Sequence, residues 1–397
     1  MTREEIYASC QTALTKSNCL LLEAATGTGK TKVSLNLINW LSDAVYKGKK
    51  PRMLLLVAKR VHKQTWKEEF EKWGGIKVSE VVIECYESLR KHTDEFFEFI
   101  VLDEVHHIQS DTRLDYLSTL KYGYMIGLSA TIPRNLQYYF KYHYHAQVVS
   151  CDILEAIADD VLPEPEIILF PLKVETSRVS ETLELHTKAP GPAVHCEYGE
   201  LKKYKFKNVH VICKCTQMQK LTELNNLIEW YKNKAMNGNQ SVKKTWLYFC
   251  GKRLEFLADC KLQWVKLILH RLRYHRTITF CKTIAQTEEL GKNCIHSKNK
   301  SAEKLYENFN AGKINHITAV NILNENANLV NCKYAIFCNI SSSDIVIPQR
   351  LGRAMRHKHP VIIVPYFKGT REQELVEKMF EGYNRNFIRT IKNINEI

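Results

Sequence analysis

The fold of this protein is indicated by a stretch near its N-terminus that reads CLLLEAATGTGKT at residues 19–31. It opens with an apolar run of the kind found in buried strands. Glycines follow, and glycine allows the backbone to curl so that its N–H groups point at phosphate oxygens. A helical segment at residues 31–46 would add its dipole. The stretch predicts a phosphate-binding loop, or P-loop, whose nucleotide-binding residues are Ala25, Thr26, Gly27, Thr28, Gly29, Lys30 and Thr31.

The side chains near this loop predict ATP and Mg²⁺ as cofactors. Lys30 would neutralise the β- and γ-phosphates of ATP, and Thr31 would hold Mg²⁺. Ala24 stands where the strict loop pattern has glycine, a replacement that many ATPases accept. Upstream, the amide of Gln11 has the groups needed to pair with adenine N6 and N7. The alternative for Gln11 is an ordinary solvated side chain.

Outward from the loop, two regions alternate short apolar runs with helix-period segments. Such alternation is typical of a parallel sheet with helices on both faces. A chain of 397 residues also exceeds the size at which one core usually stops growing. The sequence predicts an α/β fold with a first lobe at residues 1–150 and a second at 151–397. The predicted strands are residues 19–23, 53–57, 78–84, 99–102 and 124–128, then 277–280, 293–296, 316–320, 334–338 and 361–364.

Between these regions, residues 175–245 are expected to form an insert, a hairpin with helices, at the start of the second lobe. It contains five residues of types that bind zinc, namely His195, Cys196, His210, Cys213 and Cys215. The cysteine pair is C-x-C rather than C-x2-C, and a lysine-rich stretch separates the two halves of the cluster. A β-hairpin is therefore favoured over a zinc site.

Two polar segments follow predicted strands of the first lobe. Asp103 comes directly after residues 99–102, so it would lie beside the loop and reach Mg²⁺. Glu104 is the predicted group that orients or deprotonates the attacking water. His106 is expected to relay contacts toward the second lobe. Ser129 and Thr131 follow another strand and are expected to hydrogen-bond to the acidic pair.

A third segment reads QRLGRAMR at residues 349–356. On a helix, Gln349, Arg353 and Arg356 would share one face, since they are spaced at i, i+4 and i+7. Gly352 would allow a close approach to a neighbour. Planar guanidinium groups suit phosphate recognition, so the two arginines are candidate catalytic groups. The alternative is a solvated basic helix.

Charge and composition bear on partners and location. The 57 Lys and Arg residues against 43 Asp and Glu give a net charge of +14, which suggests a polyanionic partner. The alternative, that the charge only keeps the protein soluble, stays open at this point. No run of 18 apolar residues and no signal-peptide pattern is found. Together with the odd count of thirteen cysteines, this predicts a reducing cytoplasm, and a monomer is expected.

The order of these motifs resembles that of superfamily 2 helicases of the DEAD/DEAH type, in the branch that includes type III restriction subunits of bacteria and phages. The resemblance implies the cytoplasm of a bacterium or of a phage-infected host. Weaker resemblances to helicase motifs lie at residues 57–60, 86–89, 278–282 and 323–328, where Asn326 replaces a glycine. The resemblance implies two RecA-like lobes with ATP between them, and Arg356 as the arginine finger. The catalytic residues it implies are Lys30, Asp103, Glu104, Gln349, Arg353 and Arg356, and the coupling residues are His106, Ser129 and Thr131.

The resemblance also implies a function. We expect an ATP-dependent helicase or translocase that couples ATP hydrolysis to strand separation or branch migration, with DNA favoured over RNA as its partner. The alternatives are an RNA-dependent ATPase and the motor subunit of a restriction-type nuclease complex. Candidate nucleic-acid contacts are Lys59, Arg60, Lys252 and Arg253.

Overall fold

The structure is a computed structural model of residues 1–397. It describes all residues except 48–50, 205–206, 237–239, 321–328, 341–349 and 353–356. Among the described residues, no helix is both long and apolar enough to cross a membrane. The predictions for Gln349, Arg353, Arg356 and the 323–328 segment lie outside the described residues.

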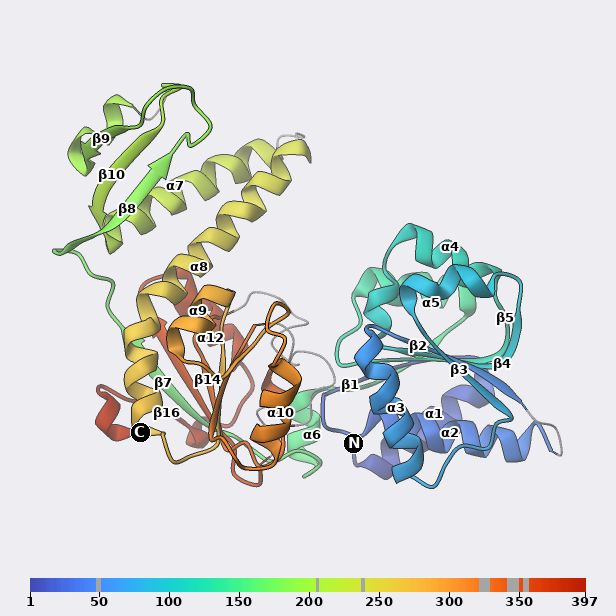
Figure 1. Ribbon diagram of the computed structural model, residues 1–397. Coiled ribbons are helices and arrows are strands. Elements are labelled where there is room, and N and C mark those ends of the chain that lie inside the picture. Colours follow the sequence, from blue (N-terminus) through green and yellow to red (C-terminus); the bar gives the residue numbers. More distant parts are fainter. Residues whose placement is uncertain (48–50, 205–206, 237–239, 321–328, 341–349, 353–356) are drawn as a thin grey trace.

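The first lobe is a parallel sheet whose described strands are ordered β3-β2-β4-β5-β1-β6. Helices α1–α3 cover one face and α4 and α5 the other (Figure 1). Successive side chains of β1 point to opposite faces of the sheet: Leu20 and Leu22 pack with α1–α3, and Leu21 packs with α4 and α5. The strands are β1 (Cys19–Ala24), β2 (Arg52–Val57), β3 (Glu80–Cys85), β4 (Phe96–Asp103), β5 (Lys121–Ser129) and β6 (Gln147–Cys151). The helices are α1 (Arg3–Lys16), α2 (Lys30–Ala44), α3 (Arg60–Lys72), α4 (Asp111–Thr119) and α5 (Arg134–Tyr144).

The second lobe is also a parallel sheet, ordered β12-β13-β11-β14-β15-β7-β16. The predicted strands of this lobe are all present. The sequence reasoning did not predict β7 and β16, which pair with each other at one edge. The strands are β7 (Glu166–Leu172), β11 (Thr277–Phe280), β12 (Cys294–Ile295), β13 (His316–Ala319), β14 (Tyr334–Phe337), β15 (Val361–Phe367) and β16 (Ile388–Thr390). The shorter helices are α6 (Ile153–Ala158), which precedes β7, α9 (Ile284–Leu290), α10 (Ala302–Asn310) and α12 (Arg371–Met379).

The insert follows β7 and has its own small sheet, ordered β8-β10-β9. The predicted hairpin is wrong: β9 (Val194–Glu197) and β10 (Val211–Thr216) pair in parallel, and β8 (Val179–Leu185) is antiparallel to β10. A parallel pair needs a crossover, and the 3₁₀ segment η3 (Tyr198–Lys203) with the lysine-rich stretch supplies it. Cys213 and Cys215 are buried in this small core. No group of three metal-binding side chains occurs among the described residues.

A pair of helices joins the insert to the second lobe. Helix α7 (Gln217–Met236) leads into α8 (Gln240–Arg271), which at 32 residues is the longest described helix. The first half of α8 packs against α7, and its second half packs on the sheet through residues such as Leu257 and Val265. A buried ion pair of 2.6 Å between Lys261 and Glu372 ties α8 to α12. The helix pair therefore extends from the lobe as an arm (Figure 1).

Candidate active site

The phosphate loop lies between β1 and α2, as the sequence predicts. Gly27 and Gly29 have φ values of 101° and 98°, in the left-handed region that favours glycine. The Thr28 hydroxyl donates a hydrogen bond to the Ala25 carbonyl at 2.8 Å, which tightens the loop. The Ala25 N–H donates to the Cys151 carbonyl of β6 at 3.0 Å. Because β1 is hydrogen-bonded to strands on both sides, the loop starts from a rigid position.

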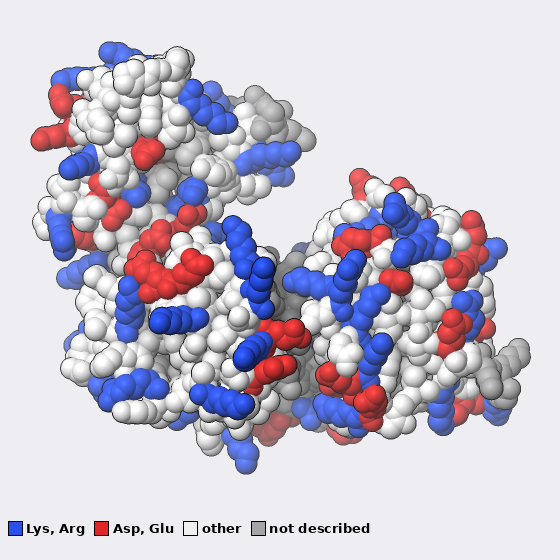
Figure 2. All heavy atoms as spheres, in the orientation of Figure 1, with Lys and Arg blue, Asp and Glu red and all other residues white. Residues whose placement is uncertain are grey.

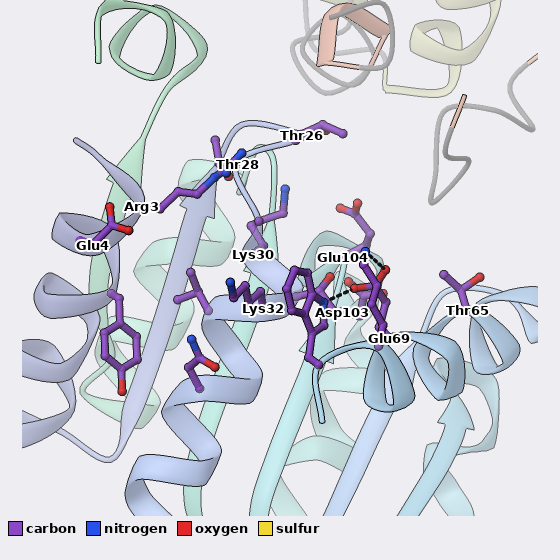
Figure 3. Close-up of a pocket in the computed structure, with 18 residues that line it drawn as sticks. Arg3, Glu4, Thr26, Thr28, Lys30, Lys32, Thr65, Glu69, Asp103 and Glu104 are labelled. Carbon is purple, nitrogen blue, oxygen red and sulfur yellow. Dashed lines mark hydrogen bonds and ion pairs between the residues drawn. The ribbon is translucent and has the colours of Figure 1, made fainter. Parts of the chain in front are cut away.

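A cavity of about 540 Å³ opens around this loop (Figure 3). The Nζ of Lys30 donates to the Ala24 carbonyl at 2.8 Å, so the side chain lies over the loop. Thr31 lines the cavity at the start of α2, where the helix dipole favours an anion. Asp103 and Glu104 line the same cavity from the end of β4. The structure thus brings together the predicted residues of the phosphate loop and of the acidic pair.

The carboxylate of Asp103 is buried and held in a fixed orientation. The indole Nε1 of Trp66, in α3, donates to Asp103 Oδ2 at 2.8 Å. The hydroxyl of the fully buried Tyr86 donates to the Asp103 main-chain carbonyl at 2.8 Å. Burial, together with the nearby charges of Asp103 and Glu104, raises the pKa of Tyr86 well above its usual value. Sequence reasoning missed Trp66. It placed Tyr86 in the 86–89 segment that resembles a helicase motif, but nothing in the local pattern ties either residue to Asp103.

Glu104 is joined to the predicted coupling residues by a short network. Ser129 Oγ lies 3.2 Å from Glu104 Oε2 and 2.9 Å from His106 Nδ1. His106 Nδ1 is itself 3.5 Å from the same carboxylate oxygen. The Thr131 N–H donates to Ser129 Oγ at 3.3 Å. Glu104 has a φ of 50°, a backbone strain of the kind that clusters at functional sites.

The predicted adenine-reading residue lies next to the cavity rather than on its lining. Gln11 is half-buried in α1, and its Nε2 donates to the Tyr7 hydroxyl at 3.2 Å. Tyr7 is four residues earlier on the same helix face and does line the cavity, together with Arg3. On the far side, Trp73 lines the cavity with Lys32 positioned 4.3 Å from the centre of its ring. The i, i+4 spacing from Gln11 could have identified Tyr7 as a cavity residue. No motif or periodicity near Trp73 points to the cavity.

The 349–356 segment reaches the phosphate loop through its described residues. Arg350, Leu351 and Gly352 are helical and buried. A Cβ placed on Gly352 would lie 2.5 Å from Thr26 Cβ and 2.7 Å from the Thr26 carbonyl oxygen. The second lobe therefore touches the loop of the first at a point where only glycine fits. Arg350 is a structural residue: one of its terminal nitrogens donates to the Asn339 carbonyl at 2.9 Å, and burial lowers its pKa to about 10.

The candidate nucleic-acid contacts fall into two separate places. Lys59 and Arg60 line a cavity of about 530 Å³ at the ends of β2 and β3, which Lys63 and Lys91 also line. Glu84 and Glu87 line it too, and Lys63 is paired with Glu84 at 2.9 Å. Lys252 and Arg253 instead lie on α8. Lys252 pairs with Glu255 at 3.1 Å, and the Arg253 guanidinium donates to the Asn225 side chain at 2.9 Å.

Two family models match the chain. The model described as "Type III restriction enzyme, res subunit" matches residues 2–134, and that described as "Helicase conserved C-terminal domain" matches residues 260–358. The first match covers the predicted phosphate loop and the acidic pair, and the second covers β11 to β14, four of the seven described strands of the second sheet. No curated protein matches the chain.

Solved structures share the fold at low sequence identity. The DNA-bound, ATP-dependent Type ISP restriction-modification enzyme LlaBIII aligns with a TM-score of 0.58 at 13% identity, covering 99% of this chain but only 31% of its own. A putative HsdR subunit of a type I restriction enzyme from Vibrio vulnificus YJ016 gives 0.60 at 18% identity, with 98% and 67% covered. S. cerevisiae Dbp5, bound to RNA and ADP BeF3, gives 0.57 at 12% identity, with 98% and 89% covered.

These neighbours confirm the prediction of two RecA-like lobes in tandem. The family models fall on the two lobes in the order that the motifs predicted. The two family matches make the chain a superfamily 2 helicase in its domain content, with a first lobe that resembles restriction subunits.

Proposed function

We propose that the chain is an ATP-driven motor that moves along DNA and separates strands or migrates branches. One observation carries this proposal. A helix of the second lobe touches the phosphate loop of the first at Gly352 and Thr26, beside the cavity that holds the acidic pair. ATP bound in that cavity would lie within reach of both lobes, so binding and hydrolysis would change how the lobes are held together. We place the lobes at residues 1–150 and 151–397.

The chemistry that we assign to the first lobe is phosphate binding and water activation. Lys30 would bind the β- and γ-phosphates. The Thr31 hydroxyl and the Asp103 carboxylate offer the oxygen ligands that Mg²⁺ prefers, so they fit the ion, which would neutralise phosphate charge. Glu104 would orient the attacking water, and its strained backbone and its contact with Ser129 support a defined position.

The second lobe would complete the site. Gln349, Arg353 and Arg356 flank or follow the residues that reach the loop, and we assign Arg356 as the arginine finger. Such a finger raises the rate by roughly 10³–10⁵. The network of Glu104, Ser129 and His106 would report the state of the nucleotide to the rest of the lobe. Closure and reopening of the lobes would then advance the motor along a strand.

DNA is favoured over RNA because the first lobe matches a restriction-subunit family. The similarity to RNA-bound Dbp5 reflects the shared fold alone, at 12% identity. A second candidate is a motor that serves a separate nuclease, either as a subunit or as part of a longer protein. The chain spans 31% of the LlaBIII chain, so relatives of this fold carry further parts. We infer that the protein acts as a monomer in the cytoplasm.

The test is an ATPase assay with single-stranded DNA, duplex DNA, RNA and no nucleic acid. We expect stimulation by DNA above that by RNA, and loss of turnover in Lys30→Ala. The matched control is Lys16→Ala, which removes an exposed lysine of the same lobe and should behave as wild type. Binding should weaken with salt, with a slope of about −0.7 per phosphate contacted on a single strand. Turnover that is indifferent to every nucleic acid would overturn the motor proposal.

A further inference from the structure

The outer half of the arm, residues 230–236 and 242–254, exposes large apolar and aromatic side chains. Trp230 on α7 is 48% exposed and Tyr248 on α8 is 57% exposed, with Leu247 and Met236 also exposed. Large exposed aromatic side chains gathered in one place typically mark a binding surface. The arm is otherwise an ordinary pair of packed helices, so these rings are not needed to fill its core.

The rings of the arm form a continuous aromatic surface. Trp230 contacts Tyr231 at a centroid distance of 4.6 Å, Tyr231 stacks on Phe249 at 5.2 Å, and Phe249 contacts Tyr248 at 5.3 Å. Tyr231 and Phe249 lie between the helices and hold the other two rings in position. Trp230 and Tyr248 are therefore preorganised, because each is supported by a ring whose own place is set by helix packing.

The segment that carries these rings is basic, although Glu229 and Glu255 flank it and pair with Lys232 and Lys252. Between Trp230 and Leu254 the sequence contains six lysines and arginines and no acidic residue. The Nζ of Lys234 lies 3.7 Å from the centre of the Trp230 ring, and that of Lys252 lies 5.9 Å from the Tyr248 ring. Lys243 and Lys244 are exposed on the same arm. Figure 2 shows Lys and Arg atoms, rather than Asp and Glu, on the visible face of the outer arm.

Aromatic rings interleaved with lysines fit a single-stranded nucleic acid better than a protein. Lysine is depleted in protein–protein interfaces, whereas both components recur in single-strand grooves. Only an unpaired base has a free face that can stack on a ring. Helix α8 also passes the carboxyl end of β15, where Lys261 Nζ donates to the Pro365 carbonyl at 3.2 Å, and this is the edge of an open α/β sheet where ligands bind.

We propose that the outer arm is a second nucleic-acid contact, which holds a single strand as it leaves or approaches the two lobes. Bases stack on Trp230 and Tyr248, and Lys234, Lys243 and Lys244 contact phosphates. Lys252 supports Tyr248 and is already paired with Glu255. This inference rests on the proposed function in one respect, that the partner is nucleic acid.

The test measures binding of a fluorescent oligodeoxythymidine and of a duplex by anisotropy. Trp230→Leu and Tyr248→Leu keep an apolar, helix-favouring side chain but remove the flat ring. Each should weaken single-strand binding by about fivefold to a hundredfold, with the salt slope unchanged. Lys234→Gln with Lys244→Gln should instead make the slope shallower by about 0.7 for each phosphate that is no longer neutralised. Because both lysines are exposed, this pair tests the proposal even if a ring variant unfolds.

A matched control lies at the other end of α8. The guanidinium of Arg273 lies 4.5 Å from the centre of the Tyr274 ring, and Tyr274 is 76% exposed, so the same chemistry occurs away from the arm. Arg273→Gln with Tyr274→Leu should bind both probes as wild type does. Photo-cross-linking of a bromouracil-containing strand should label the peptide that carries Trp230 or Tyr248.

The outcomes separate this inference from the proposed function. If wild type binds neither probe, the proposed function itself fails. If wild type binds and the arm variants bind as tightly, with cross-links elsewhere, only the arm proposal is overturned. An equal loss of duplex and single-strand binding in the ring variants would also overturn it, because a stacked duplex base has no free face.

Discussion

Gly352→Ala tests whether the contact between the lobes belongs to the working cycle. The helix that contains Gly352 would favour alanine by about 1 kcal/mol if it were isolated. In the structure, the added Cβ would lie 2.5 Å from Thr26 Cβ and 2.7 Å from the Thr26 carbonyl oxygen. The carbon–carbon distance is about 1 Å shorter than a normal contact. Thr26 belongs to the predicted phosphate loop, so its backbone cannot withdraw without disturbing the proposed nucleotide site.

The cost of the substitution falls on the arrangement in which the lobes touch. Overpacking of this kind costs about 1–3 kcal/mol, which lowers the equilibrium constant for forming the touching state by roughly 5- to 150-fold. If that state is needed for hydrolysis, kcat should fall by up to the same factor. The affinity of the first lobe for ATP should change little, since the lobes relieve the clash by moving apart. The melting temperature should not fall, because each lobe keeps its own core.

The assay is steady-state ATP turnover with saturating nucleic acid, beside nucleotide binding and thermal unfolding of the same preparation. The matched control is Gly199→Ala in the 3₁₀ segment η3, where nothing lies within 4 Å of an added Cβ. It should turn over ATP as wild type does. A Gly352→Ala protein with wild-type kcat would refute the reasoning, because the contact would then play no part in catalysis.

Three further predictions concern buried groups. Trp66→Phe removes the 2.8 Å hydrogen bond to Asp103. Because a hydrogen bond to a charged group contributes about 1.5–3 kcal/mol, the Mg²⁺ concentration needed for half-maximal turnover should rise about tenfold or more. An unchanged Mg²⁺ titration would contradict this. Burial lowers the pKa of His316 to about 4, below its value of about 6.5 in the unfolded chain. Between these two pH values only the unfolded state binds the proton, so the free energy of unfolding decreases as the pH falls from about 6.5 to 4. The loss should approach about 3 kcal/mol, and urea unfolding of His316→Leu should lack that part of the pH dependence. Glu372→Gln leaves Lys261 buried without its carboxylate partner, which should lower the free energy of unfolding by about 3–5 kcal/mol in thermal or urea melts. A decrease of less than about 1 kcal/mol would mean that the Lys261 ammonium group is hydrated in the variant.

The sequence alone determined the local elements that carry the chemistry. The apolar run, the glycines and the helical segment of residues 19–46 predict β1, the loop and α2, because each of these depends on residues that are neighbours in the chain. The same holds for Asp103 at the end of β4 and for the predicted strands of both sheets. The motif order then identified the two-lobed fold, which the structural comparisons confirm.

Only the tertiary structure decided which distant segments meet. Strand β7 pairs with β15, almost two hundred residues later, and no local pattern encodes that partner. The parallel pairing of β9 with β10 replaced the predicted hairpin for the same reason. The Trp66 indole contacts Asp103 because α3 packs beside the end of β4. Gly352 contacts Thr26 because a helix of the second lobe packs against the loop that follows β1. Periodicity specifies which face of an element is buried, whereas the fit of side chains between elements specifies what that face touches.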